Sequence, residues 1–152
     1  MPNGKMSCFA DTNLIVYTID PQEPEKRRHA KDFLTQIINR HTLVLSPQSL
    51  NECYRVVSER RDLMPRNDAR LFVWAWSAFC SARYDPEVTQ HAWRIQDRHG
   101  FGWWDCVLLA SAEVARCDVF LSEDMQHERR VDGLIILNPF KLGLDFQIPL
   151  SR

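Results

Sequence analysis

Four acidic residues lie far apart in the sequence, and each borders an apolar segment of the kind that a strand or helix buries: Asp11, Glu52, Asp105 and Asp124. Carboxylates at strand ends and helix starts are poor material for a hydrophobic core. If the four gather in one pocket, they repel one another unless a cation neutralises them. Oxygen ligands without a histidine or cysteine partner favour a hard divalent ion such as Mg²⁺ or Mn²⁺. The chemistry that this set could support is therefore that of a metal site.

Each acid taken alone also has a structural explanation. Asp11 could cap a helix that begins in Asp11-Thr12-Asn13, and Glu52 could lie on the exposed side of an amphipathic helix. Asp105 could stabilise the positive end of a helix dipole, and Asp124 could be a turn residue. Only the convergence of all four would indicate chemistry, and sequence spacing does not decide whether they converge.

Short apolar strands alternate with amphipathic helices along the chain, and these elements must position the acids. Hydrophobic periodicity predicts strands at residues 6–10, 43–45, 119–121 and 134–137, and helices at about 25–40, 47–62, 67–81, 86–99 and 103–116. This alternation indicates an α/β fold with a parallel sheet that is covered on both faces. Active sites in such sheets lie beyond the carboxyl ends of the strands. Asp11 and Asp124 both fall just past a predicted strand, so the topology favours their meeting.

The other two acids belong to predicted helices. Ser46 and Pro47 mark the start of the helix that carries Glu52, with the serine as cap and the proline at the first position. Glu52 is off the apolar stripe of that helix and is free to face the edge of a pocket. Asp105 lies in the first turn of a helix that is apolar nearly all round, which predicts a central, buried position for that helix.

Composition limits the class of protein. A length of 152 residues predicts one domain, with 45% hydrophobic and 26% charged residues. The net charge of −1 gives no global signal for nucleic acid, although setting the four acids aside leaves the remainder positive. Five cysteines without a CxxC pair suit a reducing cytoplasm rather than a zinc ribbon. No segment has the length of a membrane span, so we expect a cytoplasmic protein that does not bind a membrane.

Motifs of other chemistries are missing from the sequence. There is no GxGxxG, GxxxxGK[ST], GxSxG or HExxH motif. An aspartyl-phosphate enzyme would carry a second acid two residues after its nucleophile, but Asn13 stands there, which weakens a phosphatase reaction at Asp11. His127 is the histidine nearest a candidate acid, and we expect a structural role for it. Trp74 falls off the aromatic stripe of its helix and is expected at an interface.

The ordered set of motifs resembles the PIN-domain family, and within it the VapC-type toxins of bacterial toxin–antitoxin pairs. The matching segments are Asp11-Thr12-Asn13-Leu14, Ser46 to Glu52, Trp104-Asp105 with Leu108 to Ala112, Leu121 to His127, and Asp132 to Phe140. They follow the family order over about residues 6–140, so the resemblance implies a single PIN domain over 1–152 with a short C-terminal tail. It implies a three-layer α/β/α fold around a short parallel sheet.

The same resemblance implies an Mg²⁺-dependent endoribonuclease toxin, with Mn²⁺ as an alternative ion. Asp11, Glu52, Asp105 and Asp124 would be its catalytic, metal-binding acids, with Thr12 and Asn13 as supporting residues. We expect the first and third acids to contact metal directly and the other two to act through water or at a second ion.

Two points stay open within the resemblance. Glu123 competes with Asp124 for the last place, because strand alternation lets only one of the two point inward. The alternative function is a PIN-like module that binds RNA or protein without cutting. The implied partners are an RNA substrate, a cognate antitoxin and a second copy of the chain, with the antitoxin expected in an apolar groove between helices 25–40 and 47–62.

Overall fold

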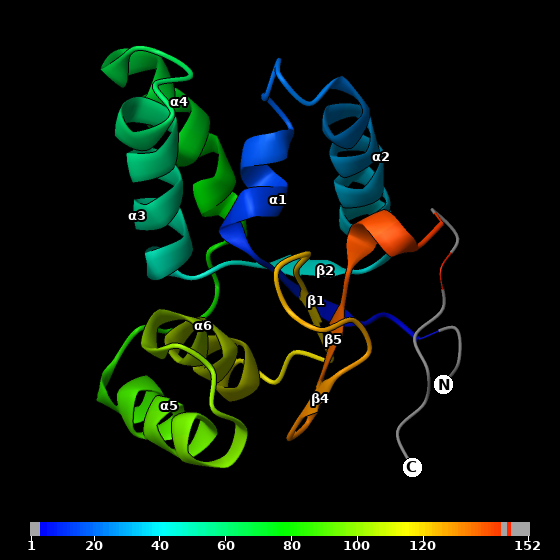
Figure 1. Ribbon diagram of the computed structural model, residues 1–152, viewed down its shortest axis with the longest axis vertical. Coiled ribbons are helices and arrows are strands. Elements are labelled where there is room, and N and C mark those ends of the chain that lie inside the picture. The colour runs from blue at the N-terminus through cyan, green and yellow to red at the C-terminus, as the bar shows by residue number, and fades with distance from the viewer. Residues whose placement is uncertain (1–3, 144–145, 147–152) are drawn as a thin grey trace.

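The molecule is organised around a five-stranded sheet with helices on both faces (Figure 1). The computed structural model describes residues 4–143 and residue 146. The strands follow the order β2-β1-β3-β5-β4; all pair in parallel except β4, which is antiparallel to β5 at the edge. The strands are β1 (Ser7–Ala10), β2 (Thr42–Val44), β3 (Val119–Leu121), β4 (Arg130–Val131) and β5 (Leu134–Leu137).

The helices form the two outer layers. One layer contains α1 (Thr12–Tyr17), α2 (Pro24–Arg40), α3 (Pro47–Arg55) with its π-helical continuation η1 (Val56–Arg60), and α4 (Arg66–Trp76). The other contains α5 (Pro86–His99) and α6 (Trp103–Val114). The described residues also form two short 3₁₀ segments, η2 (Ser77–Phe79) and η3 (Pro139–Lys141).

Strand alternation explains why both faces of the sheet are covered. Cys8 and Ala10 of β1 pack against the layer of α1 to α4, whereas Phe9 between them packs against α5 and α6. In the central strand β3, Phe120 stacks on Phe9 on that second face, with ring centroids 5.4 Å apart. Every residue of β3 and β5 is buried, as expected for parallel strands inside a three-layer fold. The predicted α/β/α architecture is therefore confirmed.

The predicted elements are present, with changes at their ends. The helix expected over 67–81 ends at Trp76 and continues as the 3₁₀ turn η2, and the helix expected over 103–116 ends at Val114. The edge strand β4 was not predicted, because two residues carry no periodic signal. No helix among the described residues is long and apolar enough to cross a membrane.

The groove expected between residues 25–40 and 47–62 is occupied by the chain itself. Helix α1 packs against both α2 and α3 and lies between them (Figure 1). Its apolar residues Leu14, Ile15 and Val16 are buried there. Helix α1 therefore separates the two helices, and the place of an antitoxin between them stays a prediction.

Candidate functional site

The carboxyl ends of β1 and β3 meet at the point where the strand order reverses. The chain leaves β1 to form β2 on one side and returns to form β3 on the other, so β1 and β3 are neighbours at a topological switch point. The amide of Asp11 donates to the carbonyl of Leu121 at 2.9 Å, and the amide of Ser122 donates to the carbonyl of Leu137 at 3.0 Å. These two hydrogen bonds continue the parallel pairing of the strands by one residue beyond their ends. Asp11 and Ser122 therefore lie just beyond the carboxyl ends of β1 and β3, where ligands bind in parallel α/β sheets.

Asp11 is the most buried acid of the group, with 9% of its surface exposed. Its Oδ1 accepts from the amide of Thr12 at 2.7 Å, which caps α1, and its Oδ2 accepts from the hydroxyl of Ser122 at 2.9 Å. Burial raises the pKa of Asp11 to about 6, against an ordinary 3.8, and the hydrogen bonds from Ser122 and Thr12 oppose part of that rise. The charges of Asp124 and Asp105 raise it further. Asp11 therefore caps α1 and is also a buried carboxylate close to other negative charges.

Glu52 is held from two sides by neutral donors. The hydroxyl of Thr12 donates to Oε2 of Glu52 at 3.2 Å, and the side-chain amide of Gln48 donates to Oε1 at 2.9 Å. Gln48 lies one turn earlier on α3 and also donates to the carbonyl of Trp104 at 3.3 Å. Helix α3 itself begins in a capping box formed by Ser46 and Ser49. Gln48 therefore joins α3 to the first turn of α6, beside Asp105.

Asp105 lies in the first turn of α6, where the helix dipole favours an anion. Burial and the neighbouring acids oppose this stabilisation of the ionised carboxylate. Burial raises the pKa of Asp105, and the charges of Asp124 and Glu52 raise it as well. The charges of Asp124 and Glu52 thus reach Asp105, and those of Asp124 and Asp105 reach Asp11, so the four predicted carboxylates lie within electrostatic range of one another.

Asp124 and Glu123 have different partners, although they are adjacent. Oδ2 of Asp124 accepts from the side-chain amide of Asn13 at 2.6 Å, and the amide of Asp124 donates to the hydroxyl of Ser122 at 3.2 Å. Glu123 instead accepts from the hydroxyl of Tyr17 and forms an ion pair of 2.8 Å with Lys26. A lysine already neutralises Glu123, which leaves Asp124 as the acid that faces the other three.

The donor set fits a hard divalent cation. The carboxylates follow β1, lie on α3 and α6, and follow β3; burial, and after it the charge of neighbouring acids, raises the pKa of Asp11 and of Asp105. Among the described residues no hydrogen bond joins two of these carboxylates; neutral donors hold Asp11, Glu52 and Asp124. Oε1 of Gln48, beside Glu52, is buried without a hydrogen-bond partner in the described part of the chain. An oxygen-rich site with uncompensated negative charge suits Mg²⁺ or Mn²⁺.

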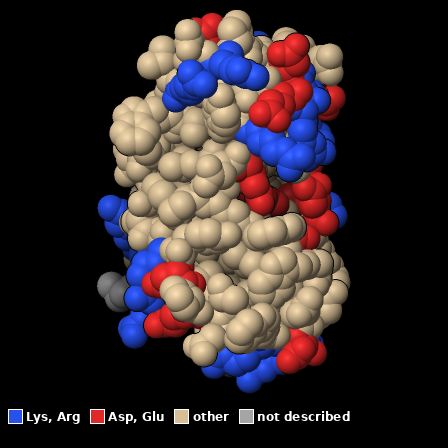
Figure 2. Space-filling view, turned by 90° about the vertical axis from the view of Figure 1, so that its left-hand side faces the viewer, with Lys and Arg blue, Asp and Glu red and all other residues tan. Residues whose placement is uncertain are grey.

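The surface view is consistent with such a site. Figure 2 shows acidic side chains gathered in a hollow between the upper and lower halves of one face, with basic side chains directly above them. The upper half contains α3 and α4, and the lower half contains α5 and α6 (Figure 1). Anionic and cationic groups therefore lie next to each other on this face.

Sequence reasoning missed two residues that organise the acids. Ser122 bonds to both Asp11 and the backbone of Asp124, and Gln48 bonds to Glu52. Gln48 had a signal, because it precedes Glu52 by four residues on a predicted helix and so shares its face. His127, in contrast, is structural as predicted: its Nδ1 accepts from the amide of Asn138 at 2.9 Å.

A four-acid cluster at the switch point of a small α/β/α sheet defines the class of this protein. The sequence model of the PIN domain matches residues 8–133, and the chain belongs to that family. No curated protein matches its sequence closely enough to report.

Solved structures share the fold at low sequence identity. VapBC2 of Rickettsia felis, bound to a DNA fragment of its promoter, matches with a TM-score of 0.64 and 16% identity, over 86% of this chain and 97% of that one. A toxin–antitoxin complex of Klebsiella pneumoniae matches with a TM-score of 0.62 and 15% identity, over 87% and 97%. VapC20 of Mycobacterium tuberculosis, a toxin that cleaves the sarcin–ricin loop, matches with a TM-score of 0.55 and 14% identity, over 74% and 86%. At these identities the likeness concerns the fold.

Proposed function

We propose that this chain is a metal-dependent endoribonuclease and the toxin of a VapC-type toxin–antitoxin pair. The observation that carries the proposal is the convergence of Asp11, Glu52, Asp105 and Asp124 at the carboxyl end of the sheet, where neutral donors fix three of them. The PIN family match and the toxin structures of the same fold support this choice among nuclease classes.

The four acids have two proposed roles, and two neighbouring residues support them. Asp11 and Asp105 are the proposed direct ligands of Mg²⁺ or Mn²⁺. The pKa of each is raised, and a bound cation would offset the cost of the negative charge on each carboxylate. Glu52 and Asp124 act through water or at a second ion. Thr12 and Asn13 hold these two acids in place through hydrogen bonds of 3.2 and 2.6 Å.

The bound ion would supply an activated water and offset the negative charge that builds on the leaving oxygen of a phosphodiester. The chain's own residues orient the carboxylates before any substrate arrives, which avoids a reorganisation cost during the reaction. Basic residues beside the site would hold the RNA backbone, and Arg55 and Arg60 are candidates on the α3–η1 segment. Their contribution would fall as salt rises.

A cognate antitoxin and a second copy of this chain are the proposed protein partners. Helix α4 presents two large apolar side chains to solvent, Leu71 at 71% and Trp74 at 75% exposed. Exposed apolar side chains with polar and charged residues around them form a surface of the kind that helical peptide partners cover. Co-expression with a candidate antitoxin, followed by purification of the pair, tests this: Leu71→Ser with Trp74→Ser is expected to lose the partner, while Arg70→Ser is the matched control.

The activity is tested with the purified chain, RNA, and Mg²⁺ with or without a chelator. We expect cleavage that needs the ion and that Asp11→Asn and Asp105→Asn each abolish. Asp97→Asn on the exposed side of α5 is the control for loss of one negative charge. Cleavage that persists in the chelator and in both variants would overturn the proposal.

The alternative is a PIN-like module that binds RNA or protein without cutting. It is favoured if expression of the chain arrests bacterial growth equally with and without the Asp105→Asn substitution. Binding of RNA without cleavage, at any Mg²⁺ or Mn²⁺ concentration, would support the same alternative.

A further inference from the structure

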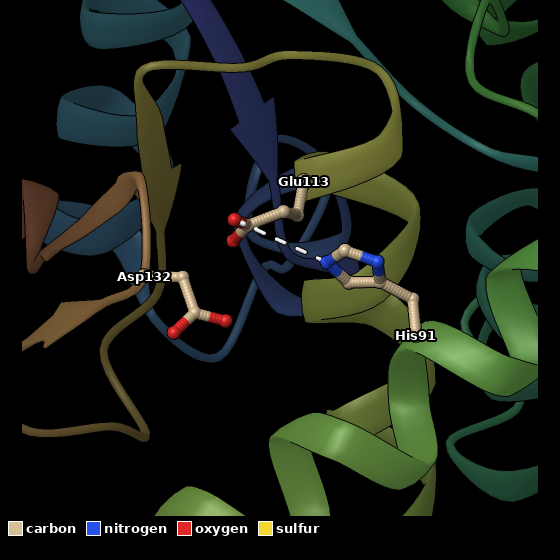
Figure 3. Close-up of side chains that lie close together, drawn as sticks. All are labelled: His91, Glu113 and Asp132. Atoms are coloured by element: carbon tan, nitrogen blue, oxygen red, sulfur yellow. Dashed lines mark ion pairs between the residues drawn. The ribbon is translucent and has the colours of Figure 1, made fainter.

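Three ligand-type side chains meet on the far layer of the fold, away from the four acids. His91 of α5, Glu113 of α6 and Asp132 of the turn between β4 and β5 point toward one another (Figure 3). One nitrogen or oxygen atom from each lies within 4.8 Å of the other two. Nε2 of His91 lies 4.0 Å from Oε1 of Glu113. Three elements that are distant in sequence therefore place metal-binding atoms at one point.

Two polar atoms at this cluster are buried without a hydrogen-bond partner in the described part of the chain, Oε2 of Glu113 and Nε2 of His99. The other oxygen of Glu113 accepts from the amide of Gly133 at 3.3 Å, so that Oε2 is left for another partner. Nε2 of His99 lies 3.5 Å from Oδ1 of Asp132. Buried polar atoms without partners are uncommon, and an ion is one of their ordinary explanations.

We propose that His91, Glu113 and Asp132 form a second metal site, and that it binds Zn²⁺. One imidazole and two carboxylates make a mixed nitrogen and oxygen ligand set with a charge that a divalent ion balances, and Zn²⁺ accepts such ligands with a water in the open position. His99 supports the site from outside by contacting Asp132, as second partners of metal ligands do.

The site is separate from the four-acid site. Asp105 and Glu113 lie eight positions apart on the same helix, α6, which places them about 12 Å apart along its axis. The four-acid site offers oxygen alone, whereas this one offers an imidazole. The two sites therefore select different ions, a hard ion in the first and a borderline one in the second.

Two arginines must give up a contact with a ligand residue before the ion can bind. Nδ1 of His91 lies 2.8 Å from Nη2 of Arg94, and Arg98 contacts Oδ1 of Asp132 at 3.3 Å. Coordination by Nε2 moves the imidazole proton to Nδ1, so Arg94 rotates away. Both arginines lie on the exposed side of α5, where such a rotation costs little. We expect Zn²⁺ affinity to rise when Arg94 is replaced by Gln.

Zn²⁺ would fasten the β4–β5 turn to α5 and α6. Asp132 has a positive φ of 53°, a backbone conformation that non-glycine residues adopt at a cost and that a metal bond would stabilise. A ligand that binds only the folded state raises the melting temperature. At about 100 times its dissociation constant, Zn²⁺ is expected to raise the melting temperature by roughly 5–10 °C.

The test uses the full chain with Asp11→Asn and Asp105→Asn, so that ion binding at the four-acid site does not contribute to the titration. Zn²⁺ is titrated by calorimetry, and Co²⁺ by visible absorption. We expect one ion per chain, no thiolate charge-transfer band, and a loss of affinity of more than ~100-fold in His91→Gln and in Glu113→Gln, beyond the 10–100-fold of outer-shell changes. His41→Gln is the matched control, and circular dichroism checks that each variant folds.

A second measurement covers variants that do not fold. Imidazole ¹⁵N spectra of the folded parent chain with and without Zn²⁺ are expected to show a shift at Nε2 of His91. Zn²⁺ affinity that is unchanged in both His91→Gln and Glu113→Gln, or an unshifted His91 signal at saturating Zn²⁺, would overturn the proposal. So would binding at millimolar concentrations alone.

Discussion

The hydroxyl of Ser122 donates a 2.9 Å hydrogen bond to Oδ2 of Asp11, across the boundary between β3 and β1. The same hydroxyl accepts from the amide of Asp124 at 3.2 Å. A single buried oxygen therefore fixes one acid through its side chain and positions a second through its backbone. This makes Ser122 a positioning residue, because its hydroxyl bonds to the side chain of one acid and to the backbone of the other.

Ser122→Ala is expected to lower RNA cleavage by about 10-fold, in the range of losses at residues that orient metal ligands. The cause is a less well oriented Asp11 and Asp124, so the Mg²⁺ concentration for half-maximal activity rises while RNA affinity stays unchanged. Measuring cleavage rates over a Mg²⁺ series, together with RNA binding, separates these effects. Ser111→Ala is the matched control, because Ser111 is buried on α6 and donates to the carbonyl of Arg83 at 3.4 Å. Equal Mg²⁺ dependence in both variants would contradict the role.

Asp11→Asn is expected to abolish cleavage yet stabilise the metal-free chain at pH 7. Burial raises the pKa of Asp11 to about 6, so the ionised carboxylate costs folding free energy above that pH. Replacing it with a neutral amide of the same shape should add roughly 1–3 kcal/mol to the free energy of unfolding. Urea unfolding of both chains in a chelator measures the difference.

The sign of the pH dependence follows from the same shift. Between the unfolded value of 3.8 and the folded value of about 6, the folded state binds more protons than the unfolded state. Stability therefore rises as pH falls from 7 through 6 toward 4, and the advantage of Asp11→Asn disappears below about 4. A constant difference between the two chains from pH 7 to pH 4 would show that Asp11 is not the group responsible. Asp97→Asn, at an exposed position of α5, is measured beside it as the control for loss of one negative charge.

Much of this site could be predicted because strand ends and helix starts have sequence signals. Asp11 and Asp124 follow apolar runs, and Asp105 opens an apolar helix, so topology brings them together. The donors that hold the acids could not be predicted, since a serine after a strand has no pattern that names its partner. The His91–Glu113–Asp132 cluster depends on where a two-residue edge strand ends, and tertiary packing alone decides that.

The choice between Glu123 and Asp124 is a further case of what sequence leaves open, and it predicts opposite outcomes for two substitutions. Asp124→Asn should lower cleavage by more than ~10-fold. Glu123→Gln should leave cleavage within a few fold and cost about 1 kcal/mol of stability, because it breaks the 2.8 Å pair with the partly exposed Lys26. Cleavage assays and urea unfolding of the two variants check both halves. Loss of cleavage in Glu123→Gln equal to that in Asp124→Asn would place Glu123 in the site.

The far end of α1 is anchored by an ion pair, and this gives a prediction about stability rather than catalysis. Oδ2 of the fully buried Asp20 lies 2.7 Å from Nη1 of Arg61, and its Oδ1 accepts from the amide of Gln22 at 3.0 Å. Burial alone would raise the pKa of Asp20, but the ion pair with Arg61 and the hydrogen bond from the amide of Gln22 lower it below 3.8. The pair therefore contributes stability that is fully present above about pH 4 and is lost as pH falls further.

Arg61→Met should lower the free energy of unfolding by about 2 kcal/mol at pH 7, because it leaves a buried carboxylate without its cation. The loss is smaller than the ~3–5 kcal/mol of a fully buried pair because Arg61 reaches solvent, with 34% of its side chain exposed. Arg60→Met, its neighbour at the end of η1, is the control for removal of one positive charge. The difference between the two variants should shrink as pH is lowered from 5 to 3, which urea unfolding at each pH measures. Asp11 precedes α1 and Asp20 follows it, so the two acids stand at opposite ends of this helix. If Arg61→Met destabilises the chain but leaves cleavage intact, then Ser122 and Thr12 hold Asp11 in place independently of the ion pair at the other end.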